Sequence, residues 1–164
     1  RRHFPAINWL NSYSLYLEAL QDYYDKEVSP EWNKIRAWAM EVLQKEAELQ
    51  EIVQLVGSDA LPEAEQVTIE VARMIREIFL QQNAYDSVDT FCDMTKQYDI
   101  MKAIKTFADL AYAAQVAGVS PAQIIAVKSK GELPQIKFIK DYKAELAKIT
   151  AQMDTEFNTL RSAA

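Results

Sequence analysis

Residues 29–57 read SPEWNKIRAWAMEVLQKEAELQEIVQLVG and contain the start signal, the periodicity and the stop signal of one long helix. Ser29 is a favourable N-cap, Pro30 suits the first helical position, and Gly57 is well placed to end the helix. Between these signals the apolar side chains recur at helical spacing and form one stripe, which consists of Ile35, Trp38, Val42, Leu49, Ile52 and Val56. This stretch predicts a helix with one buried face.

The same periodicity continues on both sides of this segment. Before it, a first helix is predicted from apolar residues at spacings of three and four: Leu10, Tyr13, Leu17, Leu20 and Tyr24. After it, a third helix is predicted from Pro62 to about Gln82 or Asn83, followed by an ordered loop over 83–94. A fourth helix should end at Gly118.

The C-terminal part of the chain is predicted to hold a short helix and a long one. Ser120 and Pro121 have the capping chemistry that begins a short fifth helix. Gly131 to Pro134 is predicted to be a turn. The last helix is long, with an apolar stripe formed by Ile136, Ile139, Tyr142, Leu146, Ile149, Met153, Phe157 and Leu160.

Composition supports the same fold class. The chain has 164 residues, 49% of them hydrophobic, with 3 glycines and 5 prolines, which favours long helices over a turn-rich β fold. No segment has the pattern of a strand hairpin. We therefore expect an all-α fold, a bundle of about five or six helices that ends in a long C-terminal helix.

Charge and chemistry exclude several classes of function. The net charge of −6, from 18 Lys+Arg and 24 Asp+Glu, argues against nucleic acid and anionic lipid as partners. No stretch approaches the roughly 18 apolar residues of a membrane span. Cys92 is the single cysteine and His3 the single histidine, so an internal disulfide and a His/Cys zinc site are not expected. A reducing, cytosolic setting is the simplest interpretation, with Cys92 as a buried structural residue.

Three stretches carry a family resemblance. They are RRHFPAINWLNSYSLY at 1–16, IREIFLQQNAY at 75–85, and VDTFC at 88–92 followed by KQY at 96–98. Together they resemble the C-terminal region of the catalytic A subunit of archaeal A-type ATP synthases and vacuolar-type ATPases. The likeness extends from Arg1 through the fourth predicted helix, and the segment after Gly118 is less distinctive.

The resemblance implies a rotary motor in which A and B subunits alternate in a ring of six around a central stalk. Flow of protons or sodium ions turns the stalk and drives ATP synthesis, and the reverse reaction hydrolyses ATP. ATP or ADP with magnesium would bind the intact protein, whose phosphate loop, catalytic carboxylate and metal site would precede Arg1. No catalytic or metal-binding residue is expected here, because the three glycines lack the context of a phosphate loop.

The chain opens on Arg1 without an initiator methionine, which fits a fragment of a larger protein. Residues 1–8 would be the end of the nucleotide-binding domain and residues 9–164 the C-terminal helical domain. We expect the fragment to be inactive alone and to bind no cofactor by itself. Its partners would be the B subunits and the central stalk, without nucleic acid and without direct membrane insertion. The complex would hold it on the cytoplasmic face of the membrane.

The resemblance also implies two sites. Aromatic residues Phe4 and Tyr85 would flank the adenine ring, and Gln82, Asn83 and Ala84 would line its edge. Many family members have Phe at the second aromatic position, and Tyr85 keeps the π face. The alternative interpretation is that both aromatic side chains only pack in the hydrophobic core.

The second implied site is a contact with the rotor at the elbow between two helices, formed by Asp59, Leu61, Glu63 and Glu65. The related F-type β subunit carries DELSEED there, so this elbow is less acidic, and a plain solvated loop is the alternative. Two other functions stay open on sequence grounds. One is a stand-alone helical adaptor that binds a partner helix in a groove. The other is a helical regulator with Cys92 as a redox sensor.

Overall fold

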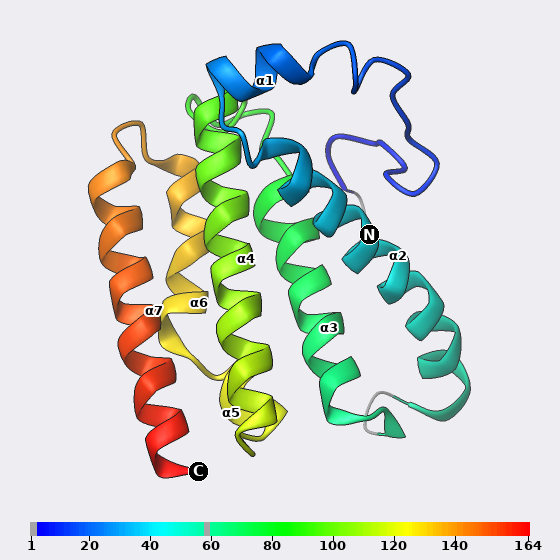
Figure 1. The fold of residues 1–164 in the computed structure, drawn as a ribbon, viewed down its shortest axis with the longest axis vertical. Coiled ribbons are helices and arrows are strands. Elements are labelled where there is room, and N and C mark those ends of the chain that lie inside the picture. Colours follow the sequence, from blue (N-terminus) through cyan, green and yellow to red (C-terminus); the bar gives the residue numbers. More distant parts are fainter. Residues whose placement is uncertain (1–2, 58–59) are drawn as a thin grey trace.

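The computed structural model describes residues 3–57 and 60–164 and shows an all-helical fold within those ranges (Figure 1). The elements in chain order are α1 (Gln21–Glu27), α2 (Trp32–Val56), α3 (Glu63–Met74), the π-helical turn η2 (Ile75–Leu80), α4 (Met94–Val116), α5 (Pro121–Ile125), α6 (Lys128–Glu132), the 3₁₀ helix η3 (Leu133–Phe138) and α7 (Lys143–Ala163). The predicted class is confirmed, and the long C-terminal helix is α7.

The four long helices form the body of the domain. Helix α3 packs against α2 and α4, and α4 packs against α7, so the helices lie in the order α2, α3, α4, α7, as Figure 1 shows. The core is continuous along this row. Between α4 and α7, Phe107 and Phe157 are fully buried, and their rings pack edge to face with centroids 5.4 Å apart. Burying each such ring contributes about 1.5–3 kcal/mol.

Local sequence signals explain the ends of α4. The Asp93 side chain accepts a hydrogen bond from the backbone N–H of Lys96 at 2.9 Å and so caps the first turn. At the other end Gly118 has φ of +95°, and the N–H of Val119 bonds back to the carbonyl of Ala114 at 3.0 Å. This left-handed glycine stops the helix and satisfies its last carbonyls.

The predicted first helix is largely absent. Residues 10–20 form turns and irregular backbone, and α1 covers Gln21–Glu27 alone. On the predicted face, Leu10 and Tyr13 are 44% and 82% exposed, so the N-terminal part of that face has no core to cover, whereas Tyr24 in α1 packs against the core. A helix this short is marginal in water without packing, which is why periodicity alone misled here.

The sequence interpretation of 131–142 also needs correction. Gly131 lies inside α6 rather than in a turn, and Pro134 falls in the first turn of η3. Helix α7 begins at Lys143, so Ile136 precedes it and belongs to η3. The 3₁₀ geometry repeats every three residues, and it buries both Leu133 and Ile136 completely.

Helix α2 extends beyond the core at its C-terminal end. Leu49 is its last deeply buried residue, whereas Ile52 is 45% exposed, so the predicted stripe stops earlier than expected. On the same helix Glu46, expected on the solvated face, is 5% exposed. Its carboxylate accepts two hydrogen bonds from Arg76, at 2.7 and 3.1 Å. This bidentate pair ties α2 to η2.

Candidate functional site

The N-terminal segment lies against the end of η2. The backbone N–H of Gln82 donates to the carbonyl of Phe4 at 2.8 Å. The residue before Phe4 makes a second contact, because Nε2 of His3 lies 3.2 Å from the carbonyl oxygen of Arg76 in η2. These two contacts join segments that are far apart in the sequence. They place the Phe4 ring, which is half exposed, beside the loop that begins at Gln81.

The π-helical turn determines where this loop leaves the helix. The N–H of Gln81 bonds to the carbonyl of Arg76 at 2.9 Å, a separation of five residues instead of four. This wide turn replaces the last turn of the predicted third helix, and Gln81 then turns to extended backbone at ψ of 130°. Single π turns of this kind are frequent at functional sites. Here the turn directs residues 82–85 toward Phe4.

Two aspartates hold the loop after this turn. Asp89 is 4% exposed, and its Oδ2 accepts from the N–H of Asn83 at 2.6 Å. The side chain of Gln82 donates to the carbonyl of Asp89 at 3.1 Å. Asp86 Oδ1 accepts from the N–H groups of Asp89 and Val88, and these hydrogen bonds lower the pKa of Asp86. The predicted ordered loop is therefore confirmed and has a defined hydrogen-bond frame.

A solvent-open pocket of about 570 Å³ lies at this junction. Its lining includes every residue that the sequence assigned to the adenine site: Phe4, Gln82, Asn83, Ala84 and Tyr85. Tyr85 is fully exposed, so core packing does not explain it. Sequence reasoning missed four lining residues, namely Gln81, Pro134, Lys137 and Phe138. The last three carry no local signal, because their place beside the loop depends on how η3 packs.

The elbow residues within the described part of the chain differ in how far they are exposed. Asp59 lies outside the described residues. Leu61 is 6% exposed, and its carbonyl accepts from the Gln66 side chain at 2.9 Å, so its side chain packs inside the domain. Glu63 is exposed and Glu65 is half-buried, both in the first turn of α3. Any outward electrostatic role at this elbow therefore falls on the two glutamates among the described positions.

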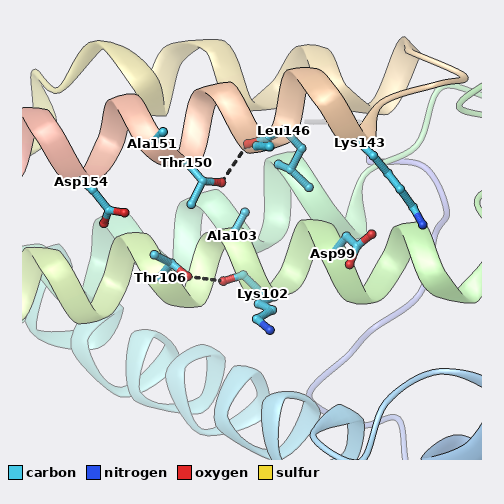
Figure 2. A pocket seen from close by; sticks show the side chains of 10 residues that line it. Asp99, Lys102, Ala103, Thr106, Lys143, Leu146, Thr150, Ala151 and Asp154 are labelled. Carbon is cyan, nitrogen blue, oxygen red and sulfur yellow. Dashed lines mark hydrogen bonds between the residues drawn. The ribbon is translucent and has the colours of Figure 1, made fainter.

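A second depression lies between α4 and α7, and Figure 2 shows it from close by. Ala103 and Thr106 of α4 lie across from Thr150 and Ala151 of α7. Both threonine hydroxyls bond to carbonyls of their own helices, at 3.0 and 2.8 Å. The floor therefore presents small side chains whose hydroxyl groups are already satisfied, and the lining also includes the charged residues Asp99, Lys102, Lys143 and Asp154.

The titratable side chains of Cys92 and Tyr142 also give no indication of a reactive site. Burial raises the pKa of the half-buried Cys92 thiol, which keeps it protonated and disfavours the redox-sensor hypothesis. Burial and a hydrogen bond to Asp99 at 2.7 Å raise the pKa of Tyr142.

Across 3–57 and 60–164 no group of three or more His, Cys, Asp or Glu residues is placed to hold a metal ion. Within the same ranges no helix has the length and apolarity needed to cross a bilayer.

Comparison with known proteins agrees with these observations. Residues 21–122 match the family described as the C-terminal domain of V and A type ATP synthase. The whole chain is 80% identical to the A subunit of the A-type ATP synthase of Methanoregula boonei and covers 28% of that protein. It is 76% identical over 99% of its length to the corresponding protein of Methanoculleus marisnigri, and 54% identical over 98% to that of Methanosarcina mazei, again covering 28% of each.

The fold and the pocket define a helical bundle domain with an aromatic-lined, solvent-open site at the junction of its N-terminal segment and the 81–85 loop. The chain belongs to the family of C-terminal domains of V- and A-type ATP synthases. It spans about 28% of the length of the curated relatives it matches. The family match does not favour a stand-alone adaptor.

Proposed function

We propose that this chain contributes one side of the adenine pocket in the catalytic A subunit of a rotary ATP synthase. The observation that carries the proposal is the 2.8 Å hydrogen bond from Gln82 to Phe4, which brings the two predicted halves of the site together. All five predicted pocket residues line the resulting cavity. The two aromatic side chains, Phe4 and Tyr85, are half and fully exposed, as expected of surfaces that await a ligand.

The chemistry of the pocket suits a base rather than a triphosphate. Stacking a base on an aromatic ring contributes about 1–3 kcal/mol in nucleic-acid complexes, or roughly five- to a hundred-fold in affinity. Gln82 and Asn83 add amide groups beside the rings. Among the described lining residues, Lys137 carries the cationic group, and its Nζ already donates to the carbonyl of Gln81 at 2.6 Å. The phosphates and magnesium would therefore be held elsewhere in the intact protein.

The wider assignment rests on the family. In the whole protein this domain would follow a nucleotide-binding domain, with residues 1–8 as the end of that domain and 9–164 as the helical domain. The whole protein would alternate with B subunits around a central stalk on the cytoplasmic face of the membrane. Proton or sodium flow would drive ATP synthesis, and hydrolysis would run in reverse. The fragment alone would be inactive, because a phosphate loop is absent from its sequence.

Replacing Tyr85 with Ala in the intact complex tests the proposal. We expect the Kd for ATP and ADP to rise by roughly five- to a hundred-fold while assembly of the complex is unchanged. Tyr13→Ala is a matched control, because Tyr13 is 82% exposed and does not line the pocket. Calorimetric titration with magnesium present measures the affinity. An unchanged Kd in the Tyr85 variant would remove this residue from the base site.

A second role at the elbow between α2 and α3 has one observation in its favour. Gly57 has φ of +86°, which ends α2 in a conformation that other residues rarely adopt, and Glu63 is exposed just beyond it. Glutamates at the start of α3 would contact basic residues of a rotor. Replacing Glu63 and Glu65 with Gln should then weaken the coupling of hydrolysis to ion transport at low salt more than it weakens nucleotide binding. Coupling that is unchanged by both substitutions would place the contact elsewhere.

A further inference from the structure

Phe138 is a half-exposed aromatic side chain at the pocket, and the Nζ of Lys137 lies 5.8 Å from the centre of its ring. It is the last residue of η3 and is 46% exposed, although Leu133 and Ile136 of the same short helix are fully buried. Its ring lines the pocket together with Phe4 and the 81–85 loop. An aromatic ring held partly open to solvent beside a cavity is the arrangement that a flat ligand requires.

Lys96 of α4 holds the backbone on both sides of Phe138. Its Nζ donates to the carbonyl of Lys137 at 2.8 Å and to the carbonyl of Ile139 at 2.9 Å. Lys96 is 4% exposed, and its ammonium lies 5.3 Å from the centre of the Tyr142 ring. A buried lysine that satisfies two carbonyls in this way fixes the path of the chain through residue 138.

Lys137 then ties the same segment to the opposite wall of the pocket. Its Nζ donates to the carbonyl of Gln81 at 2.6 Å and lies 3.7 Å from Asp89 Oδ2. The same Asp89 oxygen accepts from the N–H of Asn83. The two walls of the pocket are therefore connected through buried charged groups, because Lys137 and Asp89 are 8% and 4% exposed. The position of Phe138 relative to the 81–85 loop is set by these contacts.

We propose that Phe138 is a third aromatic contact of the purine base, with Lys96 and Lys137 as the residues that position it. The inference rests on the proposed adenine pocket and adds to it a wall contributed by η3. This wall lies beyond residues 21–122, the part of the chain that matches the family. The chemical class of the ligand is a nucleotide, whose base meets Phe138 while its phosphates bind outside this domain.

The test compares ATP with inorganic tripolyphosphate in the intact complex. Phe138→Ala should raise the Kd for ATP roughly five- to a hundred-fold, because one stacking surface is lost. Competitive inhibition by magnesium tripolyphosphate, which has no base, should be unchanged. Phe138→Tyr keeps the ring and should bind ATP nearly as the parent does. Tyr16→Ala is the matched control, since Tyr16 is 68% exposed and does not line the pocket.

Each outcome decides between the two proposals. ATP affinity that falls in Tyr85→Ala but is unchanged in Phe138→Ala overturns the role of Phe138 and leaves the adenine pocket in place. Unchanged affinity in Phe4→Ala, Tyr85→Ala and Phe138→Ala together overturns the pocket itself. Equal weakening of ATP and tripolyphosphate in Phe138→Ala shows a structural defect and also overturns the inference. Should that variant fail to assemble, Phe138→Leu preserves the apolar side chain without the ring, and the same comparison applies.

Discussion

Replacing Lys96 would measure how much one buried lysine stabilises this domain. Its ammonium, on a side chain that is 4% exposed, donates to the carbonyls of Lys137 and Ile139 at 2.8 and 2.9 Å. Lys96→Met keeps the length and most of the volume of the side chain but removes all three donors. The two carbonyls then lose their partners in a place with little access to water.

The magnitude follows from these contacts. Leaving a buried acceptor unsatisfied costs about 1–3 kcal/mol, so two acceptors cost about 2–6 kcal/mol. Loss of the contact between the ammonium and the Tyr142 ring adds about 1 kcal/mol. The substitution also removes the desolvation penalty of a buried charge and adds an apolar side chain, which offsets part of the cost. We expect a net loss of about 2–4 kcal/mol in the free energy of unfolding.

Urea unfolding followed by circular dichroism measures this loss. The midpoint should fall while the slope m stays constant, because the surface exposed on unfolding hardly changes. Lys45→Met on α2 is the control, since the Lys45 side chain is 51% exposed and makes a loose ion pair with Glu48 at 3.7 Å. That variant should lie within about 0.5 kcal/mol of the parent. A Lys96 variant as stable as the control would refute the argument from unsatisfied carbonyls.

Two further predictions concern glycine conformation and pH. Gly118→Ala should lower stability by about 1 kcal/mol because φ is +95°, whereas Gly131→Ala inside α6 should raise it by about 0.5–1 kcal/mol. Beyond the adjacent residues and the backbone of its own helix, no atom lies within 4 Å of either added Cβ, so thermal melts showing the same sign for both would contradict this account. Glu156 has a lowered pKa: burial raises it, but hydrogen bonds from Ser129 and Gln152 outweigh that effect. Its folded-state pKa lies below the ordinary 4.5, so its contribution is full above that pH and is lost as pH falls through the folded value. Glu156→Gln should therefore flatten the acid side of a stability–pH profile, and Glu145→Gln, at an exposed pair on the same helix, should leave it steep.

The sequence was most informative where capping chemistry and periodicity agree. Ser120 and Pro121 do begin α5, and Gly118 ends α4, because these signals act through the local backbone. Periodicity without a covering partner was less informative. The stripe through Tyr13 predicted a helix whose N-terminal part has no core to pack against, and Ile136 was assigned to the last helix although it lies in η3.

The candidate site likewise has one part that the sequence indicated and one part that only the structure revealed. Family resemblance placed Phe4 and the 82–85 loop in one site, and the structure brings those positions together around one pocket. Its base-binding role stays a prediction. Phe138 and Lys137 had no signal in the sequence, because their importance comes from η3 packing beside the loop.

By itself, the sequence determined the all-α class and the caps, whereas Phe4 and residues 82–85 were indicated as pocket residues only by the family resemblance. The class and the caps depend on side-chain type and on contacts within a few residues along the chain. The tertiary structure alone decided which charged residues are buried, where the π-helical turn redirects the chain, and which distant segment forms the second wall of the pocket. Such features arise from contacts between residues far apart in the sequence, and each depends on the packing of the whole bundle.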